Sequence, residues 1–160
     1  MLAVVNEPGL LAALNSFLSG DESINTLQML GELTLDLSPS GRMSKSAVFA
    51  SPCFASIKSI AAASSTLELE KEAWIVIANV AGLEVERKKD FLDSPGMVTL
   101  LLGGLKHANN DVAGNATITI HNLCVDEITA SAVLDSHPKL VQALVDSFST
   151  SGVFEKFKCK

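Results

Sequence analysis

Several residue types are scarce in this chain, and each scarcity excludes a class of protein. Its 160 residues contain no tyrosine, one tryptophan and seven phenylalanines, so few aromatic side chains are present on which nucleic-acid bases could stack. Twelve lysines and arginines stand against 18 aspartates and glutamates, and the resulting net charge of −6 disfavours binding to phosphate backbones. We therefore expect no nucleic-acid partner and a mild preference for basic partners.

Cysteine is also scarce, with Cys53, Cys124 and Cys159 as its three instances. An odd number with no close spacing fits neither a disulfide framework nor a zinc site. The first residues lack the positive region and long apolar core of a signal peptide. Unpaired cysteines favour a reducing compartment, so we expect a cytosolic location, with the nucleus as the alternative and the removal of a targeting segment left open.

No long apolar run occurs, although hydrophobic residues make up 48% of the chain and the mean hydropathy is +0.33. A membrane helix needs about 18–20 consecutive apolar residues, and the apolar stretches here are interrupted by polar residues at helical spacing. These stretches are typical of core-facing helices. We expect a single domain over residues 1–160 and no insertion into a membrane.

Sequence patterns of catalysis are missing as well. His107, His121 and His137 lack the spacing of metal ligands. The glycines at Gly103 and Gly104 lack the frame of a phosphate-binding loop, and no nucleophile elbow occurs. We therefore expect no enzymatic activity, no catalytic residue, no metal and no cofactor.

What the chain does have is an internal repeat. Pro8, Pro52, Pro95 and Pro138 are separated by 44, 43 and 43 residues, and an apolar helical stretch follows each of them. Proline is well tolerated in the first turn of a helix, where its missing N–H would have had no partner. Equal spacing of four such helix starts predicts a repeat of about 43 residues.

A second long helix is predicted inside each unit. Residues 72–83 have a counterpart at 115–126, and the comparison pairs Asn79 with Asn122. The apolar stripe of this helix follows the pattern i, i+4, i+7, i+8, i+11. Its members are Leu69, Ala73, Val76, Ile77 and Val80 in one unit, and Val112, Ala116, Thr119, Ile120 and Leu123 in the next. The segments 41–50, 84–93 and 126–135 each predict a third, shorter helix.

A unit of this length with three helices, an apolar stripe and an asparagine in Ala78-Asn79-Val80-Ala81 and His121-Asn122-Leu123-Cys124 resembles the armadillo repeat family. HEAT repeats, with two helices per unit, are the near neighbour. The resemblance covers nearly the whole chain. It implies an all-α fold, a right-handed α-solenoid of about three and a half armadillo-like three-helix repeats. The units are approximately 1–40, 41–83, 84–125 and 126–160, with the first and last incomplete.

The resemblance also implies a function, since armadillo proteins bind extended peptides in a groove lined by their long helices. There an asparagine hydrogen-bonds the main chain of the peptide, and positions one turn apart before it face the same groove. The corresponding positions in this chain are Gln28, Glu32, Glu68, Glu72, Ile75, Asn79, Asp111, Asn115, Ile118 and Asn122. Most are amides or carboxylates, which suit a basic, extended protein segment. The alternative is a solvated helix face whose asparagines stabilise neighbouring helices.

The single tryptophan separates this chain from the nuclear-import adaptors of the family, in which tryptophan precedes the groove asparagine by four residues. Trp74 precedes Asn79 by five, which turns the two side chains about 140° apart around a helix. We therefore expect Trp74 to pack between neighbouring repeats.

Apolar residues at both ends of the chain favour a second function. The outer units of a solenoid need polar caps, and the outer units here are apolar. Their apolar residues are Leu10, Leu11, Leu14, Phe17 and Leu18 in the first, and Val153, Phe154 and Phe157 in the last. The alternative function is therefore a structural subunit of a larger assembly or a homo-oligomer, docking through uncapped solenoid ends.

Overall fold

The computed structural model describes residues 9–35 and 39–150, and over these ranges the chain is all-α, with ten helices and no strand. The helices are α2 (Leu10–Phe17), α3 (Ser23–Leu35), α4 (Pro39–Ala50), α5 (Pro52–Ala63), α6 (Leu67–Val80), α7 (Val85–Asp93), α8 (Met97–Leu105), α9 (Asn110–Leu123), α10 (Glu127–Ser136) and α11 (Pro138–Thr150). The three short helices predicted from the sequence coincide with α4, α7 and α10.

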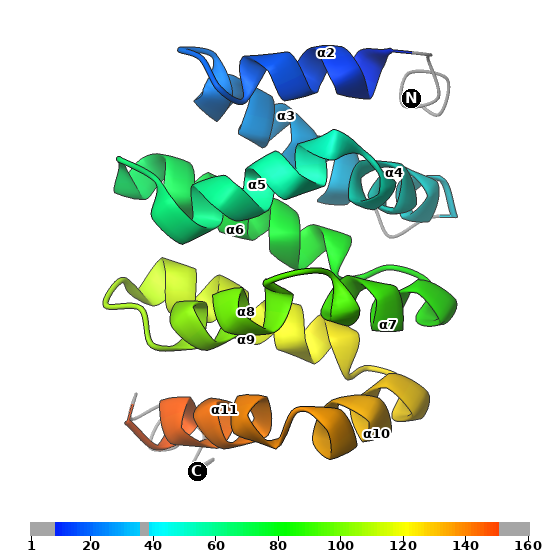
Figure 1. The fold of residues 1–160 in the computed structure, drawn as a ribbon, viewed down its shortest axis with the longest axis vertical. Helices are drawn as coiled ribbons and strands as arrows, with labels where there is room; N and C mark the ends of the chain where they lie inside the picture. The colour runs from blue at the N-terminus through cyan, green and yellow to red at the C-terminus, as the bar shows by residue number, and fades with distance from the viewer. Residues whose placement is uncertain (1–8, 36–38, 151–160) are drawn as a thin grey trace, which may run out of the picture.

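The helices lie in successive tiers along the longest axis of the molecule, with α2 and α3 at one end and α10 and α11 at the other (Figure 1). Within the two middle tiers the order is the same, namely α4, α5, α6 and then α7, α8, α9. The long helices contact one another across tiers, α3 with α6 and α6 with α9. Each long helix also packs on the preceding helix of its own tier, as α6 does on α5 and α9 on α8.

Polar side chains cap the first turns of α6 and α9. Thr66 accepts a hydrogen bond from the N–H of Leu69 at the start of α6, and Asn109 Oδ1 accepts from two N–H groups at the start of α9. Each satisfies donors that have no partner within the helix. The prediction that Pro95 lies in the first turn of a helix is wrong. Helix α8 begins two residues later, at Met97, and the residue before it, Gly96, has a φ of 79°. Glycine is favoured there because it adopts positive φ without strain.

The core is the apolar stripe of the long helices. All five predicted stripe residues of α9 are buried. In α6 four of the five are buried, and Leu69 is partly buried. The predicted stripe is therefore confirmed, and it continues into a cluster of phenylalanines, Phe49, Phe54 and Phe91, whose ring centroids lie 5.2–5.7 Å apart.

Trp74 is buried between tiers, as predicted. A β-carbon added to Gly104 of α8 would lie 2.5 Å from two atoms of its indole ring. The tryptophan of one tier therefore rests directly on the backbone of a helix in the next.

The apolar residues at the start of the chain are less exposed than the sequence suggests. Leu14 and Leu18 are buried, and Leu10 and Leu11 are partly buried. Helix α2 packs on α5, where Cys53 Sγ donates to the carbonyl of Leu11 over 2.9 Å. Phe17 remains half exposed. Val153, Phe154 and Phe157 lie outside the described residues.

Within the described ranges, no single helix has the length and apolarity needed to cross a membrane. One pair, Met43–Ala50 and Pro52–Ala63, meets both criteria together, with a bend of 78° between its members.

Candidate functional site

The ten predicted groove residues lie on α3, α6 and α9, and none of them is buried. We call them together the long-helix face. Gln28 and Glu32 belong to α3. Glu68, Glu72, Ile75 and Asn79 belong to α6, and Asp111, Asn115, Ile118 and Asn122 to α9. Because α6 contacts both α3 and α9, these residues form three neighbouring rows.

The two asparagines make the same contact with the preceding long helix. Asn79 Nδ2 donates to the carbonyl of Gly31 over 3.2 Å, and Asn122 Nδ2 donates to the carbonyl of Ala78 over 2.9 Å. Gly31 and Ala78 occupy corresponding positions in their repeats. Ala78 directly precedes Asn79, the counterpart of Asn122, and Gly31 directly precedes Glu32, the counterpart of Asn79. This is the inter-helix contact that the alternative interpretation of the asparagines predicts. Each amide also has an oxygen and a second N–H with which it can bind a ligand.

Other polar contacts join the rows and engage two of the carboxylates of this face. Gln28 Nε2 donates to Glu72 Oε1 over 3.3 Å. Lys71 Nζ lies 2.6 Å from Asp111 Oδ2, and this hydrogen bond and charge raise the pKa of Lys71. Sequence reasoning missed Lys71, because the pairing depends on the register between α6 and α9. The pair is exposed and contributes little to stability.

The face also has an apolar part. Ile75 and Ile118 are exposed at corresponding positions of α6 and α9, and Met29 is exposed beside Gln28 on α3. The Ile75 side chain lies over Gly31, 3.8 Å from where a β-carbon would be. A bound segment would therefore meet apolar surface as well as amides and acids.

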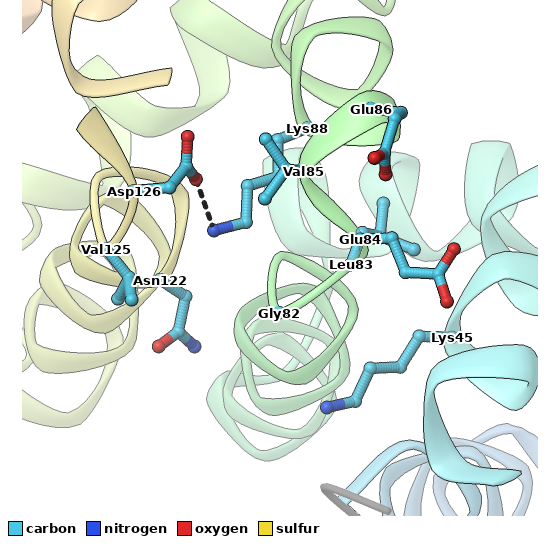
Figure 2. A pocket seen from close by; sticks show the side chains of 10 residues that line it. All are labelled: Lys45, Gly82, Leu83, Glu84, Val85, Glu86, Lys88, Asn122, Val125 and Asp126. Atoms are coloured by element: carbon cyan, nitrogen blue, oxygen red, sulfur yellow. Dashed lines mark hydrogen bonds and ion pairs between the residues drawn. The ribbon is translucent and has the colours of Figure 1, made fainter. Parts of the chain in front are cut away.

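A pocket of about 620 Å³ opens at the carboxyl-terminal end of α6, next to this face. We call it the α6 pocket. Figure 2 shows Asn122, Val125 and Asp126 on one side of the chain at Gly82, and Lys45 and Glu84 on the other. Asn122 belongs to both the α6 pocket and the long-helix face, so the two are continuous.

A buried ion pair forms part of the α6 pocket. Lys88 Nζ lies 2.8 Å from Asp126 Oδ2, with 6% and 19% of the two side chains exposed. Asp126 Oδ1 also accepts from the N–H of Thr129 over 2.7 Å, which caps α10. Burial acts to raise the pKa of Asp126, but the hydrogen bonds from Lys88 and Thr129 outweigh it and lower that pKa to about 2. This pair therefore joins α7 to the start of α10.

Two buried lysines are features that sequence reasoning missed. Lys45 and Lys88 are only 2% and 4% exposed and stand 43 residues apart. Lys45 Nζ lies 3.2 Å from where a β-carbon on Gly82 would be, just beyond the end of α6. Cations are favoured near the carboxyl-terminal end of a helix. The sequence signal that could have identified these lysines is the repeat spacing, because the two lysines recur at equivalent positions of consecutive units.

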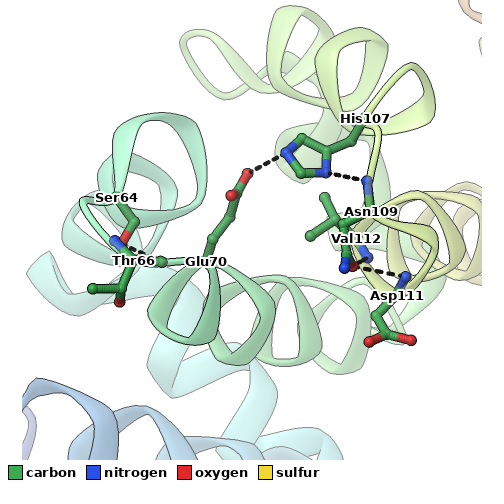
Figure 3. Close-up of polar contacts among 7 residues, drawn as sticks. All are labelled: Ser64, Thr66, Glu70, His107, Asn109, Asp111 and Val112. Carbon is green, nitrogen blue, oxygen red and sulfur yellow. Dashed lines mark hydrogen bonds and ion pairs between the residues drawn. The ribbon is translucent and has the colours of Figure 1, made fainter.

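A second polar cluster lies at the opposite end of the long helices (Figure 3). His107 Nδ1 accepts from the N–H of Asn109 over 3.0 Å, and His107 Nε2 lies 3.3 Å from Glu70 Oε1. A neutral imidazole whose Nδ1 accepts has its proton on Nε2, from which it donates to the carboxylate. The cluster connects α6 to the loop before α9, and His107 is fully used in that connection.

In the part of the chain that the structure describes, no group of three histidine, cysteine or acidic side chains could hold a metal ion. Cys53 and Cys124 are free thiols, and burial raises the pKa of both. Such thiols are less reactive than thiolates at neutral pH.

Comparison of the chain with family models, curated proteins and solved structures gave no match.

Proposed function

We propose that the chain is a non-enzymatic protein-interaction module that binds an extended, basic segment of a partner along the long-helix face. In this proposal the tiers form a right-handed α-solenoid of about three and a half armadillo-like repeats. The observation that supports it best is that amide and carboxylate side chains lie unburied in three neighbouring rows on α3, α6 and α9. The contacts of Asn79 with Gly31 and of Asn122 with Ala78 align these helices, so that equivalent side chains recur at regular intervals.

The chemistry of the face suits such a ligand. Amides can donate to and accept from any peptide main chain, whatever its sequence. The hydrogen bonds to the preceding helix hold the asparagine side chains in place before a ligand arrives, which lowers the entropy lost on binding. Exposed carboxylates at Glu32 and Glu68 attract lysines and arginines. The net charge of −6 adds to this attraction.

Location and partners follow from the same features. We propose a cytosolic or nuclear protein, since Cys53 and Cys124 are free thiols. The partner is a protein or peptide, with no nucleic acid and no membrane insertion involved.

The test is binding of a labelled, unstructured peptide of lysine, serine and glycine, measured by fluorescence anisotropy. A matched peptide with glutamate in place of lysine controls for charge. Glu32→Gln with Glu68→Gln should weaken binding of the basic peptide by about 3-fold or more. Asp90→Asn with Asp135→Asn, which removes two charges from α7 and α10, should leave it unchanged. Equal binding of the two peptides, or equal weakening by the two variants, would overturn the proposal.

A second candidate function is a structural subunit or homo-oligomer that docks through its outer helices. Phe17 on α2 and Val145 on α11 are each about half exposed, and exposed apolar side chains on outer tiers favour association. Sedimentation equilibrium tests this candidate. A mass above 16.9 kDa that returns to the monomer value in Phe17→Ser supports it, and a monomer at all concentrations contradicts it.

A further inference from the structure

One of the two most exposed large apolar side chains lines the α6 pocket. Val125 is 67% exposed and Ile128 is 75% exposed, the two largest exposed fractions among the large hydrophobic residues that the structure describes. Val125 lines the α6 pocket, and Ile128 follows three residues later, in the first turn of α10. Leaving such side chains in water forgoes the stabilisation of burial, which favours a binding role.

The same acid–apolar pair recurs at the start of two short helices. Glu84 directly precedes Val85, the first residue of α7, and 43 residues later Glu127 and Ile128 are the first two residues of α10. Val85 is exposed and lines the α6 pocket. The pocket is therefore lined by the apolar side chains of Val85 and Val125 and also by the exposed residues Glu84 and Glu86.

We propose that the α6 pocket accepts an apolar side chain of the segment that binds the long-helix face, and that Glu84 and Glu86 contact lysines or arginines beside it. This proposal rests on the proposed function, because Asn122 belongs to both the pocket and the face. The ligand is then a basic segment of a partner protein that has an aliphatic or aromatic residue at one end of its lysines and arginines.

The charges around the pocket favour this occupant over others. Lys45 and Lys88 line the pocket but are both buried, and Lys88 is paired with Asp126. Glu84 and Glu86, by contrast, are exposed. An anionic membrane surface or a second acidic copy of this chain would be repelled by those carboxylates. A basic segment with one apolar side chain satisfies both the acidic edge and the apolar walls.

The test is a double-mutant cycle between protein and peptide. Three labelled peptides share a run of six residues in which lysine and serine alternate. The first has a leucine directly before the run, the second has a leucine directly after it, and the third has serine in place of the leucine. Wild-type protein should bind one leucine peptide about 5- to 10-fold more tightly than the serine peptide. Val125→Ser should abolish that preference. Leu67→Ser, which removes an exposed apolar side chain at the other end of α6, should retain it.

The outcomes separate this proposal from the one on which it rests. Glu32→Gln with Glu68→Gln should weaken binding of every peptide while the leucine preference stays. If the basic peptides bind without any leucine preference, the pocket proposal is wrong and the proposed function stands. If no peptide binds, both are wrong. If the protein sediments as a dimer that Val125→Ser dissociates, a second copy occupies the pocket and this proposal is overturned. Unchanged circular dichroism of each variant controls for folding.

Discussion

The indole of Trp74 occupies the space that any side chain at position 104 would need, and glycine is the residue found there. A β-carbon added to Gly104 would stand 2.5 Å from Cζ2 and Cη2 of Trp74 and 2.8 Å from Cβ of Ala116. These distances are well below van der Waals contact. Neither neighbour can move freely, because both are buried in the core. The close approach of Trp74 to the backbone of α8 therefore requires glycine at position 104.

Gly104→Ala should destabilise the protein by about 1–3 kcal/mol, because it overpacks a closely filled contact between tiers. Urea unfolding followed by circular dichroism measures this. Gly103→Ala is a matched control in the same helix, since a β-carbon there meets nothing within 4 Å. Alanine is the better helix former by about 1 kcal/mol, so the control should be neutral or stabilising. Similar effects of the two substitutions would contradict the packing described for Trp74.

The asparagine contacts give a second prediction, which separates a structural role from a purely ligand-binding one. Asn79→Ala and Asn122→Ala should each cost about 1 kcal/mol of unfolding free energy, since each removes a hydrogen bond to the neighbouring long helix. Asn110→Ala removes an exposed asparagine from the first turn of α9 and should change stability by less than about 0.5 kcal/mol. If Asn79 and Asn122 served only a ligand, all three variants would be equally stable in its absence.

The same two asparagines show which features of the structure the sequence predicts and which it does not. Their repeat spacing and the stripe from Val112 to Leu123 predicted the long helices, because periodicity is a local property of the chain. Whether each amide turns to a neighbouring helix or to a ligand could not be predicted. That depends on the register between helices 44 and 48 residues apart, which no single stretch of sequence specifies.

Charged residues were the harder part of the site. Lys88 looks like an ordinary surface lysine in Val85-Glu86-Arg87-Lys88, yet it is buried because Asp126 compensates its charge. The ion pair of Lys71 is not predictable from the sequence either, because its partner Asp111 lies on another helix. The start of α8 was misplaced because Pro95 was expected to lie in the first turn, whereas Gly96 precedes that helix.

The aromatic cluster between tiers gives a third prediction. Phe91 is fully buried, and its ring centroid lies 5.7 Å from that of Phe49 and 5.4 Å from that of Phe54. Phe91→Ala should cost about 3–5 kcal/mol, because it leaves a cavity where α4, α5 and α7 meet. Phe17→Ala should cost less than about 1 kcal/mol, since that ring is half exposed. Urea midpoints of the two variants check the difference, and comparable losses would show that the cluster is not the main core.

The Lys88–Asp126 pair predicts how stability depends on pH. The pKa of Asp126 is lowered from 3.8 to about 2 in the folded protein, so the folded state binds the Asp126 proton less readily than the unfolded state does. The stabilisation from this carboxylate is therefore fully present above about pH 4 and is lost as the pH falls towards 2. A pKa difference of this size corresponds to about 2 kcal/mol at most, which exposure of the carboxylate to water reduces.

Asp126→Asn isolates this effect, because asparagine still caps α10 but leaves the Lys88 ammonium buried without its anion. The variant should be less stable than wild type by up to about 2 kcal/mol at pH 7, and the difference should shrink between pH 4 and pH 2. Asp135→Asn, on the exposed part of α10, should track wild type throughout. Carboxyl NMR titration provides the direct measurement, since Lys88→Met should raise the pKa of Asp126. A wild-type pKa near 3.8, or a constant stability difference at every pH, would show that the ion pair is not maintained in solution.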